Sequence, residues 1–262
     1  MTPLGIGPRD VLALARETRS SGATPRPLLV TGVLAEQLAR ELAAGSDGHY
    51  VVTSGDPAGA AALVRVVAGA ATRADEEALR SATRALVPVV VVQTGVSTVR
   101  LPYVLATDVV DCTPGKGFPI DEIAAVVAGV LAGRGPALAA AVPVLRPAVE
   151  RQRTVHAATA AAALVALARD EGPRFPVLTL AQARLLSDLS VSGGRTPGDD
   201  PKAVAESVAV PLAAAVGTGL VARSLVRRLP VRGRALEAAV AAGFTLALAA
   251  LARSVRSVRS GS

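Results

Sequence analysis

Cys112 is the only cysteine of the chain and could act as a nucleophile, as a thiolate close to the N-terminus of a helix. Such chemistry needs a general base, and the only two histidines are His49 and His156. Neither is near Cys112 in the sequence, so an enzyme hypothesis depends on the fold bringing His49 within hydrogen-bond reach of the thiol. The alternative is a small apolar core residue, because free cysteines are often buried.

Two kinds of ion site could lie in the same stretch. Asp108 and Asp111 are expected to close a strand at the ligand-binding edge of a sheet, where they could hold a cation, although capping and turn formation explain them equally well. Gly115, Lys116 and Gly117 could offer N–H groups and one charge to an anion, and a tight turn with a solvated lysine is the alternative that we favour. No group of residues has metal-ligand spacing, so we expect neither metal nor cofactor.

Alternating strands and helices over residues 28–133 would position these side chains. We expect strands at 28–31, 50–53, 63–67, 87–92 and 103–106, and helices at 34–44, 75–86 and 121–132. The β-branched run at 87–92 is typical of a strand that is buried on both faces. The alternation predicts an α/β fold with a doubly wound, mostly parallel sheet, whose ligands bind at the carboxyl ends of the strands.

The rest of the chain is expected to be helical. Helices are predicted at 154–168, 179–191, 203–229 and 234–255, with no strand after residue 135. The predicted organisation is therefore an N-terminal helix and linker at 1–27, an α/β domain at 28–135, an all-α domain at 136–255 and a basic tail at 256–262.

Composition limits the possible functions. The 262 residues are 51% hydrophobic and 19% charged, which excludes a disordered chain, and one cysteine excludes a disulfide framework. Only 2% of the residues are aromatic, which argues against a surface that stacks on bases, so we do not expect nucleic acid as a partner.

The net charge of +7 is unevenly placed, because residues 151–262 carry 15 basic against 7 acidic residues. This asymmetry indicates either an anionic membrane surface as a partner or simply solvated helix ends. The basic residues of interest are Arg227, Arg228, Arg232, Arg234, Arg253, Arg256 and Arg259.

The uncharged stretches 207–222 and 238–252 are shorter than the ~20 residues of a spanning helix. With no signal-peptide pattern, we expect a cytoplasmic protein attached at most peripherally to the inner face of the membrane, through residues 204–262. High salt should then remove it.

The loops of residues 28–133 follow one another in the order of the Era-like branch of P-loop GTPases, which this region resembles. The family's phosphate loop, G-x-x-x-x-G-K-[ST], would begin here at Gly32. Gln37, Leu38 and Ala39 then stand in place of the second glycine, the lysine and the hydroxyl residue. Those residues approach the phosphates, contact the β and γ phosphates and bind magnesium, so all three functions are missing.

Two further nucleotide motifs of the family are also altered. Val52 replaces the metal-linked aspartate of D-x-x-G, and Val96 replaces the guanine-reading aspartate of N-K-x-D. The glycine spacing of the last loop, S-A-x-x-G-x-G, survives at Gly115 and Gly117. The resemblance implies a GTPase-like domain in which GTP hydrolysis is not expected.

The helical half is similar to the uncharacterised domain that follows the GTPase domain in YcjF-type proteins. Residues 175–186 resemble its P-V-L-x-x-x-Q-x-R-M signature, and residues 220–230 its R-x-L-L-K-x-x-P signature. The leading hypothesis is a non-catalytic pseudo-GTPase that serves as an interaction or regulatory scaffold for an unknown protein partner. The alternative is a small-molecule-binding protein or acyl-transfer enzyme whose strand-end crevice is lined by Thr94, Asp108, Asp111, Cys112 and Lys116.

Overall fold

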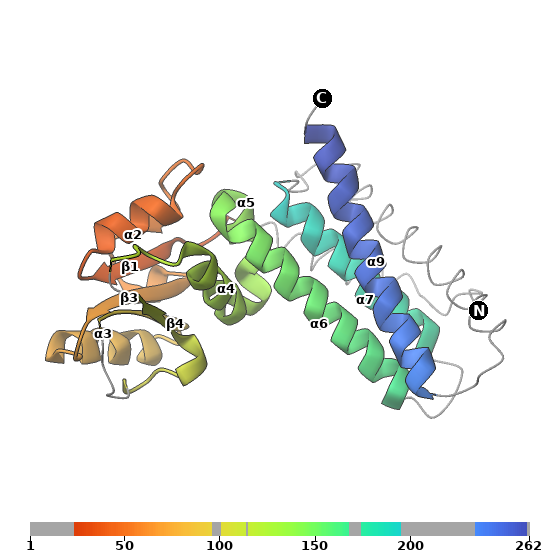
Figure 1. Ribbon diagram of the computed structural model, residues 1–262, viewed down its shortest axis with the longest axis horizontal. Coiled ribbons are helices and arrows are strands. Elements are labelled where there is room, and N and C mark those ends of the chain that lie inside the picture. The colour runs from red at the N-terminus through yellow and green to blue at the C-terminus, as the bar shows by residue number, and fades with distance from the viewer. Residues whose placement is uncertain (1–23, 96–100, 114, 168–173, 195–233, 261–262) are drawn as a thin grey trace. The chain divides into compact units, whose positions relative to one another are not determined.

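The computed structural model describes residues 24–95, 101–113, 115–167, 174–194 and 234–260 (Figure 1). The chain divides into two compact units. One consists of residues 23–152 with 192–194 and contains the sheet; the other holds residues 153–191 and the C-terminal helix.

The first unit is built on a five-stranded parallel sheet. Its strands are β1 (Leu28–Gly32), β2 (Val51–Val52), β3 (Ala62–Ala68), β4 (Val89–Thr94) and β5 (Val109–Cys112). They lie in the order β2-β1-β3-β4-β5, and every neighbouring pair is parallel. The predicted α/β fold with a parallel sheet is therefore confirmed.

Helices cover both faces of this sheet. They are α2 (Ala35–Leu42), α3 (Arg73–Arg84), α4 (Ile120–Leu131), α5 (Gly135–Ala141) and the start of α6 (Arg146–Leu167), with 3-10 turns η1 (Pro57–Gly59), η2 (Ala106–Asp108), η3 (Ala132–Arg134) and η4 (Pro143–Leu145). In Figure 1, α2 and α3 lie on opposite sides of the strands. The helices expected at 34–44, 75–86 and 121–132 are thus all present.

Alternation along the strands sorts their side chains onto the two faces. Val30, Val64 and Val92 point to the face covered by α2, α4 and α5, where they join one buried cluster. Leu63 and Val91 point to the other face, where they pack with Leu79 and Ala82 of α3. Central strands buried on both faces explain the nearly continuous aliphatic runs of β3 and β4.

The prediction of a strand at 103–106 is wrong, because β5 is formed by residues 109–112 instead. Tyr103 has a φ of 67°, which breaks an extended strand, and residues 106–108 form a 3-10 turn. The β-branched pair Val109 and Val110 provides the pairing with β4. Leu101 belongs to the core as part of a connecting loop.

The core of the α/β unit extends past residue 135. Leu138, Leu145 and Val149 are buried in the same cluster as the sheet residues. The stretch Ile120–Ala141 is long and apolar enough to cross a membrane, with a mean hydropathy of 1.7, but half of that window is buried within the structure. Such burial is equally typical of a core helix, so the stretch is weak evidence for a span.

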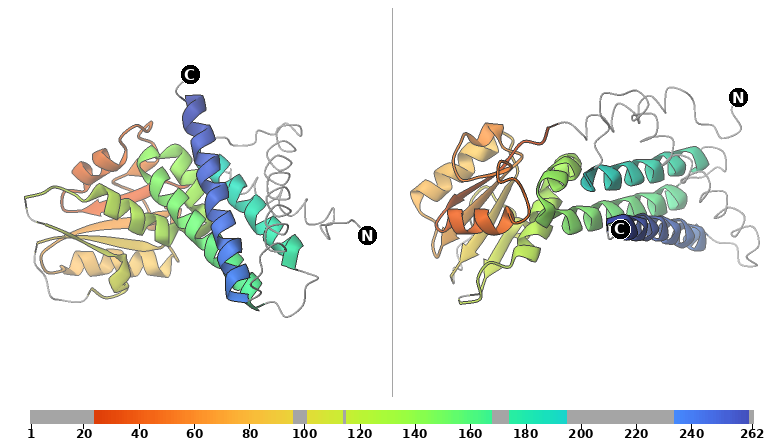
Figure 2. Two further views of the ribbon diagram at one scale, coloured as in Figure 1. Left: turned by 45° about the vertical axis from the view of Figure 1, so that its right-hand side comes forward. Right: turned by 90° about the horizontal axis from the view of Figure 1, so that it is seen from above.

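The second unit, as far as the structure describes it, is formed by α6 after residue 152, α7 (Arg174–Ser192) and α9 (Arg234–Ser260). These helices lie side by side (Figures 1 and 2), and they share small apolar contacts such as Ala161 with Ala241. Among the described residues after 135 there is no strand. The expected N-terminal helix and the helix expected at 203–229 lie outside the described residues, so a complete all-α domain stays a prediction. Helix α9 continues to Ser260, past the start of the expected basic tail.

Candidate functional site

The first strand leaves the sheet through a very close contact with its neighbour. Gly32 ends β1 with a φ of 104°, and a Cβ atom placed there would lie 2.0 Å from the carbonyl oxygen of Val66 on β3. The amide of Val33 donates a hydrogen bond to that same oxygen at 3.2 Å. Only glycine allows this approach, which carries the chain over the edge of the sheet where ligands of such folds bind.

Only two residues, Val33 and Leu34, separate β1 from α2. Leu34 caps the helix in a left-handed conformation with a φ of 57° and makes no side-chain capping bond. The helix therefore begins at Ala35, inside the segment that resembles a phosphate loop. The amide of Leu38 donates to the carbonyl of Leu34 at 3.1 Å, so this donor is used within the helix. A connection this short cannot surround a phosphate with backbone N–H groups.

Leu38 and Ala39, which the resemblance would align with the lysine and the magnesium-binding residue of a phosphate loop, lie in the core. Leu38 is 0% exposed and Ala39 is 7% exposed, and both pack in the cluster under the sheet. Gln37 is exposed, and its amide donates to the carboxylate of Glu41 at 3.1 Å. Val52 lies half-buried on β2 against the cluster on the α3 side of the sheet.

The carboxyl end of β4 uses its polar side chains within the structure. The buried Gln93 donates from Nε2 to the carbonyl of Gly69 at 3.2 Å, and Thr94 donates from Oγ1 to the carbonyl of Val67 at 3.4 Å. The amide of Gly69 donates back to the carbonyl of Thr94 at 2.9 Å. These bonds tie the end of β4 to β3 and to Gly69, and they include the hydroxyl of Thr94, which was expected to line a ligand site. Val96 lies outside the described residues.

Cys112 and His49 lie far apart in the topology of the sheet. Cys112 ends β5, one outer strand, whereas the exposed His49 precedes β2, the other outer strand. Parallel strands place a residue after one strand and a residue before another at opposite ends of the sheet. Cys112 is buried, and burial, followed by the charges of Asp111 and Glu122, raises the pKa of its thiol. His156 is an exposed residue of α6. The structure therefore does not assemble the expected nucleophile and base.

The two aspartates near Cys112 are also separated. Asp108 belongs to η2 before β5, at the end of the strand opposite to Cys112, and its Oδ1 accepts a hydrogen bond from Thr107 at 3.1 Å. Placing Asp108 at the carboxyl end was wrong, because β5 starts after it. Asp111 is exposed and points to the other sheet face from Cys112. Among the residues that the structure describes, no group of three or more acidic, histidine or cysteine side chains could hold a metal.

The glycine loop at residues 115–117 has the geometry of a tight turn. Gly115 and Gly117 have φ angles of 81° and 72°, and the amide of Lys116 donates to the carbonyl of Thr113 at 3.2 Å. All three residues are exposed. Helix α4 begins only at Ile120, after Pro119 at the cap, so the loop does not lead directly into a helix N-terminus.

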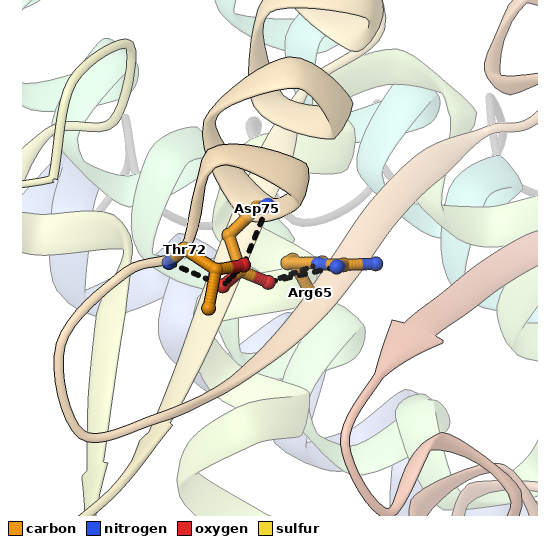
Figure 3. A network of polar contacts seen from close by, with 3 residues as sticks. All are labelled: Arg65, Thr72 and Asp75. Carbon is orange, nitrogen blue, oxygen red and sulfur yellow. Dashed lines mark hydrogen bonds and ion pairs between the residues drawn. The ribbon is translucent and has the colours of Figure 1, made fainter.

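The sequence interpretation missed a charged network on the face of the sheet covered by α3 (Figure 3). Arg65 on the central strand β3 contacts Asp75 of α3, with an Nη2–Oδ1 distance of 2.7 Å. The other carboxylate oxygen accepts from the Thr72 amide at 2.8 Å and the Thr72 hydroxyl at 2.6 Å. The T-x-x-D spacing of this capping box was the available signal. Because of this network, Arg65, the one cation on the central strand β3, is already neutralised by Asp75.

Replacing Asp75 with asparagine should lower the free energy of unfolding by about 2–4 kcal/mol at neutral pH, because it leaves Arg65 without its anion. Burial by itself would raise the pKa of Asp75, but the hydrogen bonds from Thr72 and Arg65 outweigh it and hold the pKa below its usual value. A lowered pKa contributes stability that is complete above the unfolded pKa of about 3.9 and is lost as the pH falls through the folded pKa. Urea unfolding from pH 7 to pH 2 measures both effects.

The matched control is Glu76→Gln, on the next residue of the same helix turn. This variant removes a negative charge from the start of α3 but touches neither Arg65 nor Thr72, so its effect should stay within about 0.5 kcal/mol. A gap between Asp75→Asn and the native chain that persists unchanged at pH 2 would contradict the ion pair.

The basic residues of the C-terminal part are only partly described. Arg227, Arg228 and Arg232 lie outside the described residues. Arg234 opens α9, and Arg253, Arg256 and Arg259 lie in its last turns.

Comparison with known proteins finds no match: no family model, no curated protein and no solved structure is similar to this chain.

Proposed function

We propose that this chain is a non-catalytic pseudo-GTPase that acts as an interaction or regulatory scaffold. The observation that carries the proposal is the two-residue connection between β1 and α2. It supports loss of nucleotide binding at the level of the backbone, because the helix begins where a phosphate loop would still be open. Leu38 and Ala39 then serve as core residues rather than as ligands of phosphate and magnesium.

The internal use of the strand-end donors supports the same proposal. The side chains of Gln93 and Thr94 donate hydrogen bonds to carbonyl groups of β3 and of the loop that follows it. Phosphoryl transfer depends on positioned cations and donors around the phosphates, and Arg65 is occupied by Asp75. What remains is a rigid parallel sheet, which suits a platform for a protein partner.

The first experiment is nucleotide binding by the full chain. We expect no heat of binding for GTP, GDP or ATP with magnesium, and a dissociation constant weaker than about 1 mM. The melting temperature should also stay unchanged with each nucleotide, because a ligand that binds only the folded state would raise it. A micromolar dissociation constant for any of the three would refute the proposal.

The enzyme alternative is less well supported. Its nucleophile and base lie at opposite ends and opposite edges of the sheet, and Asp108 lies away from Cys112. A small-molecule ligand at the strand ends would have to compete with the hydrogen bonds among Gly69, Gln93 and Thr94. We therefore keep the scaffold as the proposed function.

A further inference from the structure

We draw no further inference here: the strongest candidate, the exposed apolar side chains of Leu86, Tyr103 and Leu105 that precede β4 and β5, carries nothing, because nothing in the described part of the structure shows what covers them.

Discussion

Replacing Gly32 with alanine is expected to lower the free energy of unfolding by at least about 3 kcal/mol, or to prevent folding of the α/β unit. The backbone φ of 104° disfavours any residue with a Cβ atom, and that atom would lie 2.0 Å from the carbonyl oxygen of Val66. The oxygen belongs to the central strand β3 and also accepts a hydrogen bond from the amide of Val33. It therefore cannot move without breaking the bond that holds the chain where it leaves β1. Urea unfolding, followed by circular dichroism, measures the loss.

The control separates the steric clash from the strain of a positive φ. Gly69 follows β3 with a φ of 67°, and a Cβ atom there would meet nothing within 4 Å. Gly69→Ala should therefore lower the free energy of unfolding by only about 1–2 kcal/mol, because alanine adopts the left-handed conformation less readily than glycine. Equal losses for the two variants would show that β1 and β3 do not approach as closely as the structure places them.

The central strands of the sheet could be predicted from residue patterns in the sequence. The β-branched run at 87–92 predicts a strand buried on both faces, the run at 63–67 predicts a further strand, and β4 and β3 are present there. The last strand was placed too early, because Tyr103 and Val104 have strand-like side chains but belong to a loop with a left-handed residue. Local β propensity cannot show that Val109 and Val110, rather than residues 103–106, pair with β4, since the pairing depends on the neighbouring strand.

The candidate site was less predictable, because it depends on the order of the strands. Nothing in the sequence indicates that β2 and β5 are the two outer strands, and this order is what separates His49 from Cys112. The ion pair of Arg65 with Asp75 likewise joins residues from a strand and the following helix.

Leu38→Lys, which supplies the lysine that the resemblance to a phosphate loop would require, should destabilise the chain by about 4 kcal/mol and should not create nucleotide binding. Leu38 is 0% exposed beneath the sheet, so the new ammonium group would replace apolar contacts in a buried hydrophobic cluster. Urea unfolding gives the stability, and calorimetry with GTP and magnesium gives the binding.

Gln37→Lys is the matched control, because it adds the same charge one residue earlier. Gln37 is exposed and already faces Glu41 one turn away, so a lysine there should change the stability by no more than about 0.5 kcal/mol. If Leu38→Lys were as stable as Gln37→Lys and bound GTP, position 38 would face a phosphate site, and the pseudo-GTPase proposal would fall with it. If Leu38→Lys loses stability and gains no binding, the absence of a lysine is not what prevents nucleotide binding. The segment that would have to form the phosphate loop is then folded as α2, and a single substitution could not create the site.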